Sequence, residues 1–595
     1  MSRIHQCVAI CAALLTPTAA PAEAIDSEQT VVVTATRTPL AIDDALAPVI
    51  VITAEDLRRT ATFDIAEALR VYAGIEIGRN GGPGQATSLF IRGTNSNHAQ
   101  VLVDGVRVNP GTLGGAALQN IRPQDIERIE VVKGPRSSLY GTEAIGGVVN
   151  IITRRARRPF HADAEAGAGR YGTRTAGAGI AGRQGAWYAG LRGDYLTTDG
   201  FPPQSGATVD RGHENTTLGA HAGWENAGHR LALRHREARG NTEYLDFLGT
   251  PVDQDFTNAV SALEYAAPLG DAVRSTLRLA RAVDEIHQQQ SPDYAETRRT
   301  SIDWQVDWTP TAAHAFNLGL YQARENTRAE VFGGAFDERP ETRAAFVQYQ
   351  RHGARTQQLV AARHSDHDAF GGHMTWNAEH AWLIGDDWRL VAGAGTAFRA
   401  PDSTQRFGFG GDPALRPEQS RNIELGLRGR LGEHRRIEWQ VYENRIDDLI
   451  AFDLATFTLA NIDRARIRGT ELAFTHARDR WYWRQSFVLQ RPEDLGTGDP
   501  LPRRARRSMQ TALRYDAGAV HFGGELIATG PRKDSGFSDD YIGGYVLVNL
   551  SAQWALTPRW TLDARLENAL DKRYETALGF PMAGRSLFVR ARWQH

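Results

Sequence analysis

The sequence predicts a transmembrane β-barrel of about 22 antiparallel strands with an N-terminal α/β plug domain inside the lumen. From about residue 156 onward, segments alternate between two kinds of side chain: in "RIEWQVY", Ile437, Trp439 and Val441 share one face, and Glu438 and Gln440 the other. Aromatic residues recur near segment ends, as interfacial girdles require. This region holds about 440 residues, and about 20 per strand and connection gives about 22 strands, a barrel size that has a plugged lumen.

The first 24 residues have the features of a secretory signal peptide. "MSRIHQCVAICAALLTPTAAPAEA" has Arg3 near its start, an apolar stretch and a small-x-small ending, which predicts cleavage near Ala24. Cys7 and Cys11 both lie in this leader, so the mature chain is predicted to hold no disulfide or thiolate metal site. After the leader no run of about 18 apolar residues occurs, which argues against a transmembrane helix but not against a barrel. The net charge of −2 gives no nucleic-acid signature.

Residues 25–39 are predicted to be a periplasmic segment that carries a free strand. "EQTVVVTATRTP" is rich in β-branched residues, which favour extended structure, and no hairpin partner or helix is obvious beside it. An unpaired strand offers its N–H and C=O groups to another chain. We therefore expect this strand to be paired by another protein, and it consists of Gln29, Thr30, Val31, Val32, Val33, Thr34 and Ala35.

Residues 40–153 are predicted to form the plug, and residues 154–595 the barrel. "PVIVIT", "SLFIRG", "AQVLVDGVRV" and "IERIEVVKG" have the pattern of short strands, and "DIAEALRVYAG" has apolar residues at helical spacing before Gly74. Arg92 and Arg136 are charges among apolar strands. Because buried charges need partners, we expect carboxylates of the barrel wall to face them.

Three apparent motifs have simpler interpretations. "GAGRYG" at Gly167–Gly172 matches G-x-G-x-x-G but lacks the following helix of a dinucleotide site. His364, His367 and His373 lie close in sequence, yet "DAFGGH" is typical of a hairpin turn, which disfavours a metal site. "RRARR" at Arg503–Arg507 is first interpreted as a solvated rim.

The chain resembles the TonB-dependent outer-membrane receptors along nearly its whole mature length. "QTVVVTA" is similar to the TonB box, "FIRGT" and "VLVDGVRVN" to plug strands, and "GPRSSLYGTEAIGGVVNIIT" to the closing motif of the plug. "ENALDKRYET" and "AGRSLFVRARW" resemble the family's last two strands. The resemblance implies a monomer in the outer membrane of a Gram-negative bacterium, surrounded by outer-membrane lipid and energised by TonB.

Within this family, the chain most resembles receptors for vitamin B12 (cobalamin). "NGGPGQATSLFIRGTNSNH" is similar to their substrate-facing plug loop, and "FGFGGDPALRPEQS" and "LPRRARR" to barrel segments. By motif position, the resemblance implies six ligand contacts, which are Ala86, Ser88 and Asn95 on a first plug loop, Leu113 and Gly114 on a second, and Arg503 in the barrel.

The resemblance also raises calcium as a possible, not obligatory, cofactor. Receptors of this kind carry an aspartate cluster in outer loops, and hard oxygen ligands suit Ca²⁺. Here the spacing differs, and acidic loops that merely hydrate are the alternative. The candidate ligands are Asp199, Asp210, Tyr244, Asp246 and Asp253, with Asp255 nearby.

The function that the resemblance implies is high-affinity capture of cobalamin outside, followed by active transport into the periplasm. A siderophore or haem receptor of the same architecture is the main alternative. A secreted β-rich hydrolase lacks support because no nucleophile motif is present, and a passive porin needs neither a plug nor a pairing strand. The chain is therefore expected not to be an enzyme.

Overall fold

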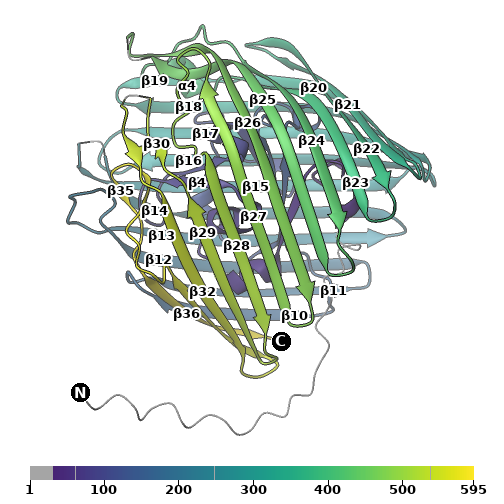
Figure 1. Cartoon of the computed structure of the whole chain (residues 1–595), viewed down its shortest axis with the longest axis horizontal. Coiled ribbons are helices and arrows are strands. Elements are labelled where there is room, and N and C mark those ends of the chain that lie inside the picture. The colour runs from purple at the N-terminus through teal and green to yellow at the C-terminus, as the bar shows by residue number, and fades with distance from the viewer. Residues whose placement is uncertain (1–30, 61, 247, 454, 537) are drawn as a thin grey trace.

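A computed structural model describes residues 31–60, 62–246, 248–453, 455–536 and 538–595. The predicted signal peptide and the residues Gln29 and Thr30 lie outside the described residues. A large β-barrel encloses a small N-terminal domain, drawn in purple inside the barrel in Figure 1. No helix among the described residues is long and apolar enough to cross a membrane.

The barrel is a closed antiparallel sheet of 22 strands, as predicted. Its first half is β10 (His161–Gly169), β11 (Arg174–Gln184), β12 (Trp187–Phe201), β13 (Arg211–Asn226), β14 (His229–Leu245), β15 (Pro251–Pro268), β16 (Val273–Gln288), β17 (Tyr294–Thr311), β18 (His314–Val331), β20 (Glu341–His352) and β21 (Thr356–His367). The second half is β22 (Gly371–Ile384), β23 (Trp388–Arg399), β24 (Glu418–Arg430), β25 (Arg435–Asp453), β26 (Thr458–Arg478), β27 (Trp481–Asp494), β28 (Arg507–Asp516), β29 (Val520–Thr529), β32 (Tyr545–Ala555), β33 (Trp560–Glu567) and β36 (Ser586–Gln594). β10 pairs with β36, which closes the ring.

Short elements extend the barrel at the end that carries its long connections, the outer end. β19 (Gly334–Glu338) pairs with β18 beyond the point where β18 pairs with β20. The outer connections also hold α4 (Ser403–Phe407) and two small hairpins, β30 (Arg532–Lys533) with β31 (Tyr541–Ile542) and β34 (Glu575–Ala577) with β35 (Phe580–Pro581).

The predicted alternation separates a lipid-facing surface from the lumen. On β25, Trp439 is 44% and Val441 39% exposed, whereas Gln440 between them is 5% exposed and faces the plug side. The connections at one end are short, such as residues 431–434, and those at the other are long, such as residues 400–417. Because outer-membrane barrels have short periplasmic turns and long outer loops, this contrast orients the barrel.

The plug contains a mixed five-stranded sheet of order β3-β8-β9-β6-β7. These strands are β3 (Val49–Thr53), β6 (Ala99–Val103), β7 (Val106–Arg107), β8 (Ile126–Lys133) and β9 (Gly147–Thr153). The helices are α1 (Ala54–Thr60), α2 (Ile65–Ala73) and α3 (Ser137–Tyr140), and a separate hairpin joins β4 (Glu76–Arg79) to β5 (Thr87–Phe90).

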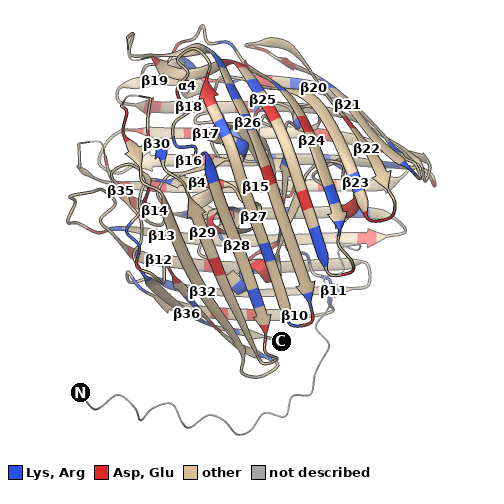
Figure 2. Ribbon diagram, viewed as in Figure 1, with Lys and Arg blue, Asp and Glu red and all other residues tan. Residues whose placement is uncertain are grey.

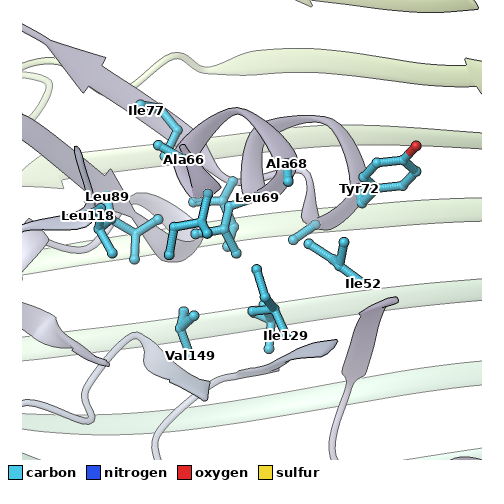
Figure 3. Close-up of a cluster of buried hydrophobic side chains, with 14 of the residues drawn as sticks. Ile52, Ala66, Ala68, Leu69, Tyr72, Ile77, Leu89, Leu118, Ile129 and Val149 are labelled. Carbon is cyan, nitrogen blue, oxygen red and sulfur yellow. The ribbon is translucent and has the colours of Figure 1, made fainter. Parts of the chain in front are cut away.

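Helix α2 anchors the plug core and fixes it to the barrel. Asp64 caps its first turn by accepting a hydrogen bond from the Ala66 amide, and Gly74 ends it in a left-handed conformation. Its side chains pack on the sheet residues Ile52, Ile129 and Val149, as Figure 3 shows. The same apolar cluster includes Ala512, Ile527, Tyr545 and Leu547 of the barrel wall, so the plug and the barrel share a core.

The expected free strand is instead folded back onto the plug, which corrects the sequence prediction. β1 (Val31–Val32) pairs antiparallel with β2 (Leu40–Ala41), and Val32 is fully buried. The chain reverses between the two strands, where the Thr36 amide donates to the Val33 carbonyl and Arg37 takes a positive φ of 61°. The partner strand was missed because it has two residues and follows a tight turn.

Candidate functional site

The two predicted ligand-binding plug loops lie at the outer end of the barrel and approach each other. Gly114, with φ of +70°, sits where an added Cβ would lie 3.2 Å from the Asn97 Cβ and 3.1 Å from an Asp402 carboxylate oxygen. This glycine therefore allows the second loop to contact both the first loop and the barrel connection that carries α4. Leu113 beside it is 47% exposed, so its side chain is open to a ligand from outside.

The first loop is a hairpin whose tip contacts the barrel wall. Ala86 is exposed and Ser88 half-buried, and Ser88 pairs with Gly78 across the β4–β5 hairpin. Gln85 donates to the Glu243 carbonyl at 2.7 Å. Ala86 and Ser88 are thus held on a two-stranded support at the outer mouth.

Asn95, the third predicted contact on this loop, is tied to an arginine that the sequence did not single out. Arg504 donates to the Asn95 side-chain oxygen and, at 3.3 Å, to the Gly93 carbonyl. Its guanidinium lies 4.6 Å from the centre of the Phe90 ring. Burial lowers the pKa of Arg504 to about 10, but it remains charged at neutral pH.

Arg503, the arginine predicted to contact ligand, faces a different neighbour. Its side chain donates to Asp534 at 3.1 Å in the next outer connection, and it is about one-third exposed. The two adjacent arginines therefore bind different loops. Arg503 contacts an outer connection of the barrel, and Arg504 contacts the first plug loop. The motif "LPRRARR" marked this segment as a candidate ligand contact, but it could not predict which of its arginines points toward the plug.

A buried polar network ties the first plug loop to the barrel connection. His98 Nε2 lies 2.8 Å from Glu418, and Arg399 donates to the same carboxylate oxygen at 2.7 Å. Arg399 also contacts Asp402, the residue that caps α4, at 3.0 Å. Burial lowers the pKa of His98, against the attraction of Glu418. The network joins both plug loops to one outer connection, because the amides of Ser403 and Thr404 donate to the second loop.

The two plug arginines that the sequence singled out, Arg92 and Arg136, meet barrel glutamates, as predicted. Arg92 contacts Glu424 at 2.7 Å and Glu471 at 3.4 Å. Arg136 contacts Glu379 at 2.7 Å, with both side chains almost fully buried. These ion pairs fix the orientation of the plug in the lumen.

The folded-back strand is held by one plug carboxylate. Glu130 on β8 accepts from the amides of Val33 and Thr34, at 2.9 and 2.8 Å, and from the Thr34 hydroxyl at 2.6 Å. Tyr140 donates to the Thr34 carbonyl at 2.9 Å. The backbone that another chain would need is therefore occupied within the plug.

The predicted calcium ligands are not assembled into one cluster. No group of three or more acidic, histidine or cysteine side chains suited to a metal occurs among the described residues. Asp246 accepts from the Leu248 and Thr250 amides of its own turn, and Asp253 lies 3.9 Å from Arg211.

The remaining motifs lie in simple hairpins. Gly167–Gly172 spans the end of β10 and the turn to β11, with no helix after it. His364 and His367 lie on β21 and His373 on the paired strand β22, as the hairpin interpretation predicted.

A cavity of about 720 Å³ lies at the periplasmic end of the plug, away from the ligand loops. It is bounded by α1, residues 153–158 and the wall strands next to the barrel closure, and arginines dominate its charged lining. It therefore lies on the other side of the plug from the predicted ligand loops.

Two family models match the chain. The "TonB-dependent Receptor Plug Domain" matches residues 41–148, and the "TonB dependent receptor-like, beta-barrel" matches residues 156–569. Curated relatives include the vitamin B12 transporter BtuB of Photobacterium profundum, 30% identical over 587 residues and 96% of each chain. BtuB of Vibrio vulnificus is 30% identical over 598 residues and 95% of each chain.

Solved structures with the same fold are more distant in sequence. The siderophore receptor PirA from Acinetobacter baumannii superposes with a TM-score of 0.80 at 16% identity, covering 92% of this chain and 98% of its own. FpvA of P. aeruginosa, bound to pyoverdines, gives a TM-score of 0.83 at 15% identity, with 95% and 88% coverage. At such identities the likeness establishes the shared fold alone.

Proposed function

The chain belongs to the TonB-dependent receptors of the Gram-negative outer membrane, and from that premise we propose that its transported ligand is cobalamin. As a receptor and transporter it is not an enzyme. Cobalamin would be captured at the outer face by the plug loops and the adjoining barrel loops, and would pass into the periplasm after the plug rearranges.

The observation that carries this proposal is the full-length similarity to two vitamin B12 transporters, each 30% identical to this chain. The siderophore receptors share the architecture at 16% identity or lower in the examples above, which does not favour their ligands. A siderophore or haem is nevertheless the alternative ligand class, because those receptors share this architecture. A binding test decides between that class and cobalamin.

The proposed ligand contacts suit an uncharged, amide-rich corrinoid. Ala86, Ser88, Asn95, Leu113 and Gly114 bring small, apolar or neutral hydrogen-bonding groups to the outer mouth. Arg503 is proposed as a sixth contact from the outer connection that follows β27. Calcium binding by the acidic loops is proposed as an aid to this capture.

The energy-coupling step is proposed to use the strand Gln29–Ala35 as a TonB box. TonB would add to its backbone edge by β-augmentation, as extended segments pair with a sheet edge. Because Val32 and Thr34 are held within the plug, release of this segment has to precede pairing. Ligand binding outside would shift that equilibrium, a coupling between two sites.

Titration of the purified protein with cyanocobalamin tests the ligand. We expect saturable binding, and no competition from a ferric siderophore or haem. Ser88→Ala and Asn95→Ala should each weaken binding by roughly 0.5–1.5 kcal/mol, the worth of an ordinary hydrogen bond. Binding of an iron chelate without binding of cobalamin would assign the receptor to the alternative ligand class.

A further inference from the structure

A row of arginines faces outward on four neighbouring strands, β24 to β27, just beyond the lipid-facing apolar belt. On β25 the exposed Trp439 and Val441 are followed, toward the outer end, by Arg445 on the same face. On β27 Leu489 is 56% exposed and is followed by Arg491, which is 69% exposed. Figure 2 shows charged segments on these strands. The row therefore lies where the outer leaflet's headgroups meet its acyl chains.

Several of these arginines stand directly opposite one another. Arg421 pairs in register with Arg445, Arg445 with Arg466, and Arg468 with Arg491. Like charges directly opposite each other on antiparallel strands are destabilising. An anion between them would turn that repulsion into attraction.

The carboxylates of the protein only partly neutralise this patch. Glu443 is shared by Arg445 and Arg468, and Glu493 by Arg466 and Arg491. Asp447 lies 3.7 Å from Arg421. Arg464 and Arg506 make no ion pair with any described residue. The arginines thus outnumber the acids, and the patch consists of Arg421, Arg445, Arg464, Arg466, Arg468, Arg491 and Arg506 against Glu443, Asp447 and Glu493.

An apolar groove continues from this patch into the membrane. It has a volume of about 690 Å³, and its walls include Ile423, Leu425, Val441 and Leu489 as well as the arginines Arg468, Arg491 and Arg506. A cationic rim joined to an apolar groove matches a ligand with a phosphorylated head and acyl chains. Juxtamembrane basic residues attract anionic lipid headgroups by about 1 kcal/mol each.

We propose that this surface of β24–β27 is a binding site for a phosphorylated lipid of the outer leaflet. The phosphates would lie between the opposed arginines, and one acyl chain would lie in the groove below them. The site is on the outside of the wall, separate from the cobalamin loops and from the strand that pairs with TonB.

A second groove on the barrel exterior provides an internal control. It has a volume of about 790 Å³ and is lined by Leu277, Ile302, Trp304 and Leu320, and Arg343 is the one arginine among the described residues that line it. Nearby Arg324 stands directly opposite Glu341, which Arg343 also contacts, at 2.7 Å. Asp366, which also lines this groove, stands directly opposite Arg343. The two arginines therefore meet two carboxylates within the protein, and this groove should not select phosphate.

The test is native mass spectrometry of the full mature protein in detergent, titrated with three lipids: diphosphorylated lipid A, dephosphorylated lipid A and phosphatidylethanolamine. We expect the wild type to retain the diphosphorylated lipid preferentially. The double variant Arg468→Gln/Arg491→Gln should retain it about 30-fold less, which is the effect of two arginines at about 1 kcal/mol each. Arg324→Gln/Arg343→Gln is the matched control and should behave as the wild type.

Thermal unfolding separates lipid binding from a folding defect. Diphosphorylated lipid A should raise the melting temperature of the wild type and of the control, but not that of Arg468→Gln/Arg491→Gln. Without lipid, the double variant should melt close to the wild-type temperature. It loses the Arg468–Arg491 repulsion together with one ion pair to each glutamate, while Glu443 keeps Arg445 and Glu493 keeps Arg466 as partners. Equal retention of phosphorylated and dephosphorylated lipid, unchanged retention by the double variant, or an equal loss in the control would each overturn the proposal.

Discussion

Arg503 and Arg504 are neighbours in the chain, yet one faces an outer loop and the other the plug. Arg504 holds Asn95 and the Gly93 carbonyl of the first plug loop, whereas Arg503 contacts Asp534. We expect Arg504→Gln to weaken cobalamin binding at least fivefold, about 1 kcal/mol, because the loop loses charge-assisted hydrogen bonds. Isothermal titration of the purified protein would measure this.

The matched control for this prediction is Arg503→Gln, one position earlier. It should change cobalamin affinity by less than Arg504→Gln if the plug loop is the main contact. A larger loss in Arg503→Gln would contradict this and would support the direct contact that the family resemblance implies for Arg503.

At the residue scale, the sequence predicted contacts correctly where a buried charge required a partner of opposite charge. Arg92 and Arg136 lie among apolar strands, so their need for carboxylate partners could be stated in advance, and glutamates of the barrel meet them. The inward turn of Arg504 and the His98–Glu418–Arg399 network could not be predicted. They depend on the register of loops and strands that are more than 300 residues apart in the chain, as the separations of 320 and 409 residues show.

At the level of single elements, the strand Val31–Val32 is held by a carboxylate that can be removed. Glu130 accepts three hydrogen bonds from Val33 and Thr34. We expect Glu130→Ala to shift this segment toward its released form, since buried amides would lose their acceptor. The mature chain is predicted to be free of cysteine, so Ala35→Cys, at a position now 3% exposed, reports release by its rate of maleimide labelling.

Glu127→Ala is the control for that experiment, because Glu127 lies on the same strand β8 but contacts Arg128 and Arg157. Labelling of Ala35→Cys should accelerate in the Glu130→Ala background and not in the Glu127→Ala background. Equal rates in all three backgrounds would mean that Glu130 does not control docking.

The acidic outer loops allow a separate prediction about calcium. Asp246 and Asp253 are engaged in their own turn and near Arg211, so a calcium site would need these loops to rearrange. If Asp199, Asp210, Tyr244, Asp246 and Asp253 gather around Ca²⁺, cobalamin affinity should rise with calcium and fall with a chelator, because loop ordering would precede binding. Magnesium at equal concentration controls for screening. An equal response to both ions, or to neither, would exclude a calcium-specific site.

At the scale of the whole molecule, the barrel was predictable and the docking of the N-terminal segment was not. The two-residue side-chain period of strands such as β25 is a local property, and the length of the region set the strand number. The pairing of Val31–Val32 with Leu40–Ala41 depends on a turn and on distant residues such as Glu130, about 100 positions later. A local pattern could show the tendency to form a strand but not its partner.

Because the proposed capture loops and the proposed coupling strand lie at different places in the plug, one substitution should separate ligand binding from uptake. Val32→Pro removes a backbone donor and blocks strand pairing, so we expect it to abolish active cobalamin uptake. Surface binding of cobalamin to whole cells should stay at the wild-type level, because the plug loops that carry Ser88 and Leu113 lie at the outer mouth. Radiolabelled cobalamin would measure binding in de-energised cells and uptake in energised cells.

Val32 is also fully buried, so the loss of packing has to be distinguished from the loss of pairing. Val32→Ala keeps the backbone N–H and removes only methyl groups, and it should retain most uptake. If Val32→Ala and Val32→Pro lose uptake equally, packing of this segment is what matters. If Val32→Pro lowers binding as much as uptake, the segment supports the plug structure and its role as a TonB box fails, because a coupling strand acts only after the ligand has been captured.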